Sequence, residues 1–431
     1  MGNNVKLQTL KGFNDYFYTD ATIRDYVRNV YKETVKLYGY EPLETPSLEY
    51  SKLILGQSGA EAEKLYYRFK DNGDRDVMLR YELMTSMCRA VAQNINNLTF
   101  PYKRYQIQNV WRADNVQKGR YREFTQMDLD ILGSNTTLAD AEVIEIGLTF
   151  LKKLGFTNYV ARINSRKILE GAVEYLQIPN SSFENIYIAI DKLEKIGKDN
   201  VKAILLEDGI EEDKINKLMD IIQTNDLNKL EQTVGTTSVG KEGIEEVREI
   251  LEILSNTELD KNTYKLDTTL ARGLASYTGF VCELEVKDGN VGSVSGGGRY
   301  DKVISKYIGR EIPAVGLSFG LERLTDIIKD RGMYTEKTPI AKVLISYMDK
   351  QQLPYTLKTA QELRKNGISC YIYPNNAKIG NTIKYAEKKN IPWMIIIGEQ
   401  EVSQSVLQLK NLSKKEQSTL SLAQAIDILS K

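Results

Sequence analysis

Polar and apolar residues alternate along two stretches between Lys103 and Gly133, and this pattern constrains the fold more than any other feature of the chain. Successive side chains of a β-strand point to opposite faces, so alternation predicts strands with unlike faces. It predicts strands over residues 103–112 and 120–132. The even-numbered face carries Arg104, Gln106, Gln108, Arg112, Arg120, Arg122, Phe124, Gln126, Asp128 and Asp130; the opposite face carries Tyr105, Ile107, Trp111, Met127, Leu129 and Ile131.

The even-numbered face is graded in charge. Its arginines gather at the loop end, and Asp128 and Asp130 lie at the far end. Arginine forks suit phosphate oxygens, an aromatic ring such as Phe124 can stack on a base, and carboxylates accept hydrogen bonds from an amine or a ring N–H. The face could therefore hold a nucleoside triphosphate beside a small amine-bearing substrate. A solvent-facing strand whose charges pair across the sheet explains the pattern as well, and both interpretations stay open here.

Two glycine-containing segments extend the candidate site. Residues 296–301 follow a predicted strand, and their three glycines allow a backbone to approach a ligand closely. Residues 316–323 are predicted to open a helix over about 316–329, from which Arg323 could reach a phosphate. Each segment is weak by itself, because tight turns and close packing use the same residues.

The chain has 431 residues, more than one hydrophobic core usually organises. Residues 1–328 are predicted to form one domain, interrupted by a helix-rich, acidic insertion at about 168–255. A polar segment with Gly332 and Pro339 is typical of a linker. Residues 338–431 then order short apolar strands (343–346, 369–373 and 393–398) and helices as βαβαβ, which predicts an α/β domain with a largely parallel sheet.

Charge is unevenly divided between these parts. Residues 338–431 hold 13 lysines and arginines against 7 acidic residues, a net charge of +6, so the remainder carries −6. A basic module on an acidic body favours a polyanionic partner. Ordinary lysine enrichment of a solvated surface explains the count equally well.

The chain contains no histidine, which excludes an imidazole base, a histidine-based triad and histidine metal ligands. Cys88, Cys282 and Cys370 are scattered and are expected to be reduced, buried thiols of a cytoplasmic protein, so no metal site built from histidine or cysteine is expected. Mg²⁺ held by carboxylates and a substrate phosphate remains possible. No run of about 18 apolar residues predicts a membrane span, and the N-terminus lacks the apolar run of a signal peptide.

Several segments, taken together, match the motifs of one known family: residues 11–15, Pro46, 79–83, 110–115 with 119–124, 272–274 with 277–279, and 316–323. On these residues the chain resembles the histidyl-tRNA synthetases of the class II aminoacyl-tRNA synthetases, over nearly its whole length. Pro46, residues 110–124 and residues 316–323 are similar to the three class motifs. Residues 79–83 and 272–279 are similar to histidine-specific segments, and residues 338–431 resemble the anticodon-binding domain of several class II enzymes.

The resemblance implies an α+β catalytic domain with an antiparallel sheet flanked by helices, a helical insertion, and a C-terminal α/β anticodon-binding domain. It implies a homodimer with Pro46 at the interface. It also implies an enzyme that activates L-histidine with ATP to histidyl-adenylate and transfers it to the 3′ end of tRNA(His). ATP would be a substrate, with Mg²⁺ on its phosphates.

The resemblance also assigns residues to roles. Arg112 would hold the α-phosphate and the histidine carboxylate, Arg272 would stabilise charge building at the α-phosphate, and these two with Arg323 would be the catalytic residues. For ATP, Arg120 and Arg323 would hold the outer phosphates, Phe124 would stack on adenine, and Asp114 would make a further contact. For histidine, Glu82 and Gln126 would bind the amino group, Asp130 and Tyr277 the imidazole, and Met84 and Ser276 would form part of the pocket wall. Gln117 and Lys118 would meet the acceptor end of the tRNA.

Three positions depart from the family pattern beside the expected histidine pocket. Met84 stands where threonine is usual, and Ala275 and Ser276 stand where Asp-Tyr is usual. The changes either weaken or reshape histidine binding, or they are compensated nearby. The alternatives are a non-charging paralogue, such as the regulatory subunit of ATP phosphoribosyltransferase, and a synthetase for another amino acid. The arginines and the C-terminal module favour the enzyme, and residues 272–274 with Asp130 favour histidine.

Overall fold

The computed structural model describes residues 7–55, 64–272, 276–287, 292–334, 341–375 and 378–430. The chain divides into two compact units, Met1–Tyr334 and Thr335–Lys431. The positions 273–275, which include the departure at Ala275, lie outside the described residues. Among the described helices, none combines the length and apolar character that crossing a membrane requires.

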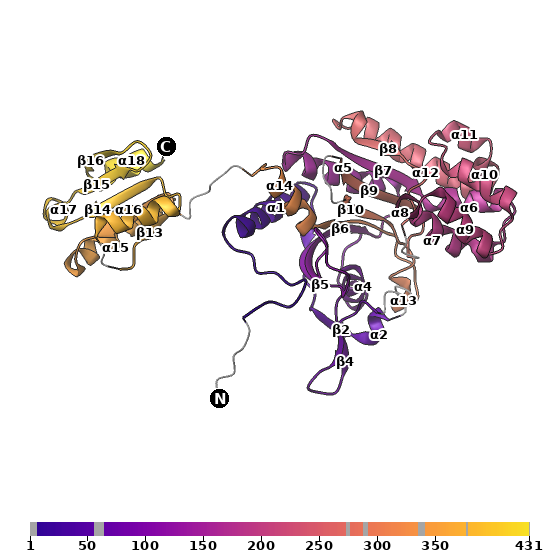
Figure 1. The fold of residues 1–431 in the computed structure, drawn as a ribbon, viewed down its shortest axis with the longest axis horizontal. Coiled ribbons are helices and arrows are strands. Elements are labelled where there is room, and N and C mark those ends of the chain that lie inside the picture. The colour runs from indigo at the N-terminus through magenta and orange to yellow at the C-terminus, as the bar shows by residue number, and fades with distance from the viewer. Residues whose placement is uncertain are drawn as a thin grey trace. The chain divides into compact units, whose positions relative to one another are not determined.

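An eight-stranded, mostly antiparallel sheet forms the centre of the first unit (Figure 1). Only the outermost pairs, β1 with β5 and β7 with β8, are parallel. In spatial order the strands are β1 (Glu41–Pro42), β5 (Tyr102–Trp111), β6 (Glu123–Leu132), β11 (Ala314–Gly320), β10 (Ser293–Arg299), β9 (Phe280–Val286), β7 (Tyr159–Ser165) and β8 (Tyr264–Leu266).

Three helices cover one face of this sheet and explain its apolar side chains. They are α1 (Tyr18–Leu37), α5 (Thr137–Lys153) and α14 (Leu321–Asp330). The odd-numbered residues Met127, Leu129 and Ile131 of β6 are buried in the core that these helices share. The predicted hairpin of unlike faces is therefore confirmed, and its even-numbered face is left for a site on the other side of the sheet.

Two boundaries of the prediction are wrong. β6 begins at Glu123, so Arg120 and Arg122 precede the strand instead of continuing its alternation, and a short turn joins Gln117 to Arg120. Residues 316–320 belong to strand β11, and the helix begins only at Leu321. Strand β11 lies between β6 and β10, and its backbone groups pair with both neighbours.

The insertion is helical. Its first helix packs against its last where Gly171 meets Gly240: a β-carbon on Gly171 would lie 2.4 Å from the Gly240 Cα, so only glycine allows this approach. The α-helices are α6 (Arg166–Tyr175), α7 (Phe183–Asp191), α8 (Leu193–Ile196), α9 (Lys198–Glu207), α10 (Glu212–Ile222), α11 (Leu227–Glu231) and α12 (Ser238–Ser255).

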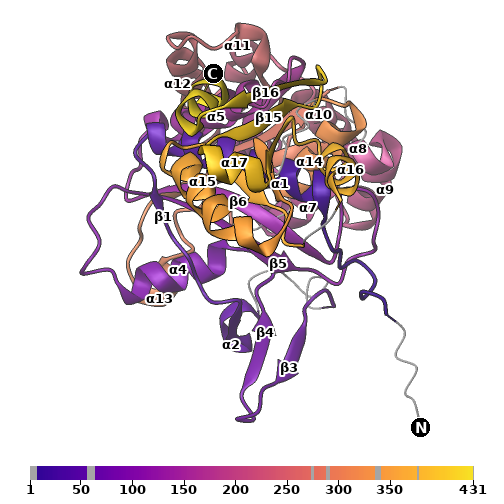
Figure 2. The ribbon, with the colours of Figure 1, turned by 90° about the vertical axis from the view of Figure 1, so that its left-hand side faces the viewer.

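A second, three-stranded sheet lies below β5 in the view of Figure 2. Its order is β2-β4-β3, and both pairs are antiparallel. The strands are β2 (Leu48–Tyr50), β3 (Arg68–Lys70) and β4 (Asp76–Leu79), and the nearby short helices are α2 (Ser51–Ile54), α4 (Met84–Gln93) and α13 (Ser305–Ile308).

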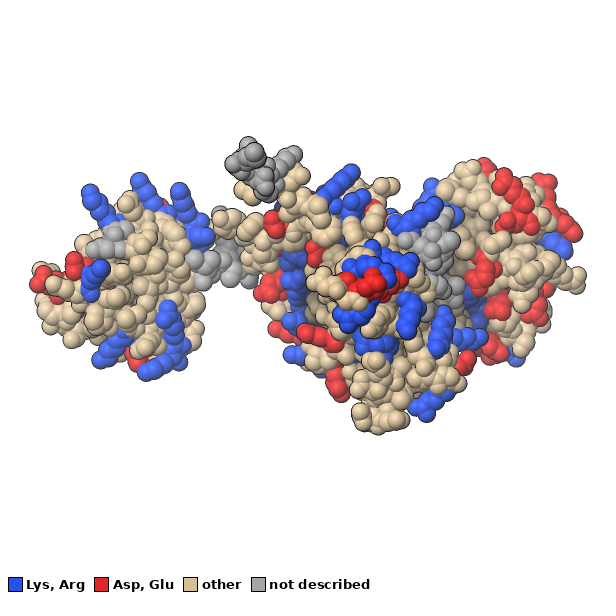
Figure 3. Space-filling view, turned by 90° about the horizontal axis from the view of Figure 1, so that it is seen from below, with Lys and Arg blue, Asp and Glu red and all other residues tan. Residues whose placement is uncertain are grey.

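The second unit is an α/β domain with its own core. The predicted βαβαβ order is present, and a hairpin that was not predicted, β15 with β16, adds two antiparallel strands. Lysine and arginine side chains outnumber acidic ones on the face of this unit in Figure 3. The elements are β12 (Val343–Tyr347), α15 (Leu353–Lys365), β13 (Cys370–Ile372), α16 (Ile379–Lys388), β14 (Trp393–Ile397), α17 (Glu399–Gln404), β15 (Leu407–Asn411), β16 (Glu416–Leu420) and α18 (Leu422–Ser430).

Candidate active site

A cavity of about 460 Å³ opens on the even-numbered face of the central sheet. The face is buried, since Gln126, Asp128 and Asp130 are each less than 10% exposed. The solvent-facing alternative for this hairpin is therefore wrong. The cavity brings together the predicted residues Glu82, Met84, Arg112, Asp114, Arg120, Phe124, Gln126, Asp130, Arg272, Ser276, Tyr277 and Arg323.

Glycines form the floor of this cavity. A β-carbon on Gly296 would lie 1.7 Å from Nη1 of Arg272, and one on Gly316 would lie 1.9 Å from Oδ1 of Asp130. These two positions, on β10 and β11, must lack a side chain for the arginine and the carboxylate to reach into the cavity. The glycines of both predicted segments thus give room to charged side chains.

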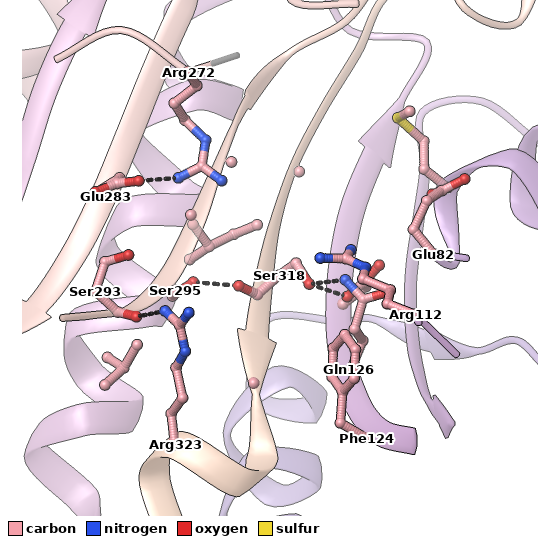
Figure 4. A pocket seen from close by; sticks show the side chains of 18 of the residues that line it. Glu82, Arg112, Phe124, Gln126, Arg272, Glu283, Ser293, Ser295, Ser318 and Arg323 are labelled. Carbon is pink, nitrogen blue, oxygen red and sulfur yellow. Dashed lines mark hydrogen bonds and ion pairs between the residues drawn. The ribbon is translucent and has the colours of Figure 1, made fainter. Parts of the chain in front are cut away.

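Arginines from four separate segments line the cavity: Arg112, Arg120, Arg272 and Arg323. Figure 4 shows three of them, with Arg272 and Arg323 on one side and Arg112 beside Gln126 on the other. The Arg112 guanidinium lies 4.4 Å from the centre of the Tyr81 ring and 5.1 Å from that of Phe124, and its Nε donates to the Tyr81 carbonyl at 3.1 Å. Arg272 forms an ion pair with Glu283 at 2.7 Å. Arg323 donates to the carbonyl of Ser293.

Like charges gather around Arg323. Burial, followed by the charge of Arg120 and more weakly those of Arg112 and Arg272, lowers the pKa of Arg323, while Glu283 opposes the shift. Several cations lining one cavity, of which Glu283 neutralises only part, favour binding of a polyanion such as a phosphate chain.

Carboxylates define the opposite end. Asp130 forms a 2.5 Å ion pair with the fully buried Arg104, directly across the hairpin, and accepts a hydrogen bond from the Tyr300 hydroxyl. Burial raises the pKa of Asp128 to about 7, against the lowering effect of Arg104. Glu82 accepts the backbone N–H of Thr85 at 2.9 Å.

Apart from Oδ2 of Asp130, which forms the ion pair with Arg104, three buried polar atoms of the cavity-lining residues have no hydrogen-bond partner among the described residues. They are Oε1 of Gln126, Oγ of Ser276 and Nε of Arg272. A buried polar atom without a partner is costly, so such atoms mark places where a ligand or water completes the bonding. Together they indicate a polar ligand between the arginines and the carboxylates.

Two predicted residues lie apart from the cavity. Gln117 and Lys118 are exposed on the turn before β6, and Lys118 forms an ion pair with Asp330 of α14. The same turn is held where the Tyr121 hydroxyl donates to Asp326 at 3.3 Å. The structure thus places the residues expected to meet tRNA on a surface loop beside the site.

Sequence reasoning missed several residues of the cavity wall. Asp128 was on the graded face but received no role. Tyr81, Tyr300 and Ser318 lie in the segments 79–83, 296–301 and 316–323 but received none either, and Glu283, Ser293 and Ser295 come from strands whose alternation was not examined for a site. Within the described residues, no group of three or more acidic or cysteine side chains is arranged to hold a metal ion.

Comparisons with known proteins agree with this geometry. Residues 12–324 match the family model of histidyl-tRNA synthetase, and residues 342–431 match that of the anticodon binding domain. The histidine–tRNA ligase of Clostridium tetani is 35% identical over 435 residues, covering 99% of this chain and 98% of the relative.

Solved structures show the same fold. The histidyl-tRNA synthetase from Nostoc sp. PCC 7120 superposes with a TM-score of 0.85 at 27% identity, covering 98% of this chain and 99% of the other. An ATP phosphoribosyltransferase regulatory subunit/histidyl-tRNA synthetase from Bacillus halodurans, at 19% identity and a TM-score of 0.78, shares the fold over 92% of this chain and 99% of its own. By its family match and its full-length relatives, this chain belongs to the histidyl-tRNA synthetase family.

Proposed function

We propose that this protein activates L-histidine with ATP and transfers the histidyl group to tRNA(His). The observation that carries the proposal is the division of one buried cavity into an arginine end and a carboxylate end. The first suits a triphosphate, and the second suits the ammonium and ring N–H groups of histidine. Ordered along one hairpin, the two ends would bring the amino acid carboxylate beside the α-phosphate.

In the first step a carboxylate oxygen of histidine attacks the α-phosphorus, the bond to the β-phosphate breaks, and pyrophosphate leaves. Arg112 would contact both reacting groups, because its Nε alone is used by Tyr81 and its terminal nitrogens face the cavity. Arg272 would stabilise the charge that builds at the α-phosphate, and Arg120 and Arg323 would hold the outer phosphates. Phe124 would stack on adenine, with Asp114 nearby.

In the second step the terminal ribose hydroxyl of tRNA attacks the carbonyl of the adenylate, and AMP leaves. Positioning and cationic stabilisation supply most of the acceleration in such transfers, so a chain without histidine is chemically adequate. Gln117 and Lys118 would meet the acceptor end. The basic C-terminal unit would contact the tRNA backbone and unstacked anticodon bases.

Histidine itself would lie at the carboxylate end. Glu82 and Gln126 would bind its ammonium, and Asp130 and Tyr277 its imidazole, with Met84 and Ser276 completing the wall. The hydroxyl of Ser276 is buried without a partner, so a polar group of the substrate or a bridging water can satisfy it.

Mg²⁺ fits this site as an ion carried by the nucleotide. Glu283 is a hard oxygen donor in the cavity wall but is bound to Arg272, so the phosphates would supply most of the ligands. When bound, the ion would neutralise part of the phosphate charge.

We also propose a homodimer through the segment that contains Pro46. Leu48 and Tyr50 on β2, and Phe69 on β3, are each more than 40% exposed, and clustered apolar side chains at a surface favour a protein partner. Sedimentation of the full-length protein tests this, and a monomer at micromolar concentration would contradict it.

Histidine-dependent exchange of labelled pyrophosphate into ATP tests the activation step. We expect exchange with histidine and Mg²⁺, and none with the other amino acids. Absence of exchange with histidine would favour the alternative, a non-charging regulatory paralogue. Exchange with a different amino acid would overturn the specificity.

A further inference from the structure

The side-chain amide of Gln126 is bonded on one side only. Its Nε2 donates to Oγ of Ser318 at 2.8 Å, and that hydroxyl donates to Oδ1 of Asp128 at 2.5 Å (Figure 4 shows the Gln126–Ser318 contact). Its Oε1 is buried and has no partner among the described residues. All three side chains line the cavity, so the free oxygen belongs to the wall of the site.

The register of the sheet fixes this chain of hydrogen bonds. Gln126 and Asp128 are two residues apart on β6 and share a face, and Ser318 on β11 is the direct cross-strand partner of Asp128. The Ser318 carbonyl is held in turn by the Ser295 hydroxyl at 2.8 Å. The three groups therefore meet through backbone pairing and not through flexible side chains alone.

The chemistry of Asp128 sets the donor-to-acceptor direction of these hydrogen bonds. An ionised carboxylate can only accept hydrogen bonds, so the Ser318 hydroxyl must donate to it. The lone pairs of Ser318 are then left to accept, and only the NH₂ group of Gln126 can donate to them. The amide is thereby turned so that its carbonyl oxygen, and not its NH₂ group, is left without a partner and can accept a hydrogen bond from a ligand.

We propose that Asp128 and Ser318 are positioning residues that orient the Gln126 carbonyl to accept a hydrogen bond from the α-ammonium of the histidine substrate. The proposal rests on the proposed function and gives a role to two residues, Asp128 and Ser318, to which the sequence motifs assigned none. An ammonium needs acceptors, and an inverted amide would present two N–H donors to a cation. Loss of one charge-assisted hydrogen bond weakens binding roughly tenfold.

Two substitutions test the direction of these hydrogen bonds, with pyrophosphate exchange measured at pH 8, where Asp128 is ionised. Asp128→Asn keeps the shape, but its amide can donate to Ser318 and free that hydroxyl to donate to Oε1 of Gln126. Ser318→Ala removes the acceptor of the Gln126 amide. Each should raise KM for histidine roughly tenfold, with kcat and KM for ATP changed much less, and Ser318→Thr should restore the wild-type KM.

Coupling and analogue binding separate this role from a general effect on the fold. The double variant Asp128→Asn/Ser318→Ala should raise KM for histidine no more than either single change does, because both substitutions break the same chain of hydrogen bonds. Inhibition by histidinol, which keeps the ammonium, should weaken as histidine binding does. Inhibition by 3-(imidazol-4-yl)propionate, which lacks it, should be unchanged.

The proposal would be overturned if the two substitutions raised KM for histidine additively in the double variant, or if both inhibitors bound the variants equally more weakly. Wild-type KM values in both single variants would overturn it as well. Wild-type protein that exchanges with no amino acid would instead overturn the proposed function and the positioning role with it. Circular dichroism of each variant confirms that the comparison is made on folded protein.

Discussion

At the scale of single residues, Gly296 holds the space that Arg272 occupies. The three atoms nearest to the β-carbon of an alanine would all belong to the guanidinium of Arg272, the closest being Nη1 at 1.7 Å. The arginine can swing away, so the fold should survive while the cation leaves its place beside Glu283. We expect Gly296→Ala to lower kcat/KM for pyrophosphate exchange about 100-fold or more, with little change in Tm.

Gly297, the next residue, provides the matched control. Its alanine β-carbon would lie 1.9 Å from the carbonyl oxygen of Gly316 and 2.8 Å from the Cα of Leu317, which are backbone atoms of the neighbouring strand. Gly297→Ala should therefore force β10 and β11 apart and lower Tm strongly. A Gly296→Ala variant that keeps full activity would show that Arg272 does not act from its present position.

Asp128 gives stability a pH dependence of known sign. Its carboxyl has a pKa of about 7 in the folded protein against an ordinary value of 3.8, because burial outweighs Arg104, while Asp130 and Glu82 add repulsion. The folded state therefore holds the proton more tightly, and the stability it contributes is present below about pH 4 and lost as pH rises through 7.

Asp128→Asn removes the titrating carboxyl, so stability is no longer lost as the pH rises, and the asparagine still gives Ser318 a hydrogen-bond partner. We expect the Tm of the variant relative to wild type to rise between about pH 5 and pH 8 and then to level off. Thermal unfolding of both proteins across this range measures the difference. Parallel curves would mean that the Asp128 carboxyl titrates near its ordinary pKa.

At the scale of elements, a buried ion pair joins α1 to the start of α14. Arg24 of α1 donates to Glu322 at 2.8 Å and to the Thr125 hydroxyl at 3.1 Å. Both carboxylate oxygens of Glu322 accept the N–H of Thr125, one residue past the point where β11 stops pairing with β6 at Gly320. Glu322 thus extends the strand contact and fixes Phe124 and Gln126 relative to Arg323.

Removing one member of such a pair leaves the other charge buried. We expect Arg24→Met to lower the unfolding free energy by about 3–5 kcal/mol, measured by thermal or urea unfolding. Arg28→Met is the control from the next turn of α1, since Arg28 reaches the Thr125 hydroxyl only at 3.5 Å. Equal destabilisation by both changes would show that the ion pair with Glu322 is not the cause.

The same scale shows what the sequence could predict. Alternation predicted β5 and β6 because each has one face in the core and one face in the site. Strand β11 was assigned to a helix because its glycines at 316 and 320 break the alternation that marks a strand, and its pairing partners lie far away in sequence.

For the site, the arginines and Asp130 could be named from their motifs. Ser318 and Glu283 could not, because their partners are set by the three-dimensional fold: Ser318 lies opposite Asp128 on the neighbouring strand, and Glu283 on β9 pairs with Arg272 of the segment before that strand. No local pattern in the sequence encodes such a pairing. The partner of a polar residue is therefore the part of a site that sequence reasoning finds last.

At the scale of the whole molecule, the chain combines a site for histidine with a composition that contains none. The cavity explains why this is possible: charge is handled by arginines and carboxylates, and neither transfer step needs an imidazole. Because the sequence contains no histidine, its translation requires no charged tRNA(His). Its synthesis should then continue when histidine is scarce, which is when more charging capacity is useful.

We therefore predict that synthesis of this protein falls much less on histidine starvation than that of a variant with histidine at three exposed positions, Gln232, Gln400 and Gln404. These positions lie outside the cavity wall, so the two purified proteins should exchange pyrophosphate at equal rates. Pulse labelling in a histidine auxotroph, with the same promoter and message ends, measures the difference. An equal fall in both would mean that the absence of histidine has no effect on supply, and would leave the replaceability of imidazole in this site as its explanation.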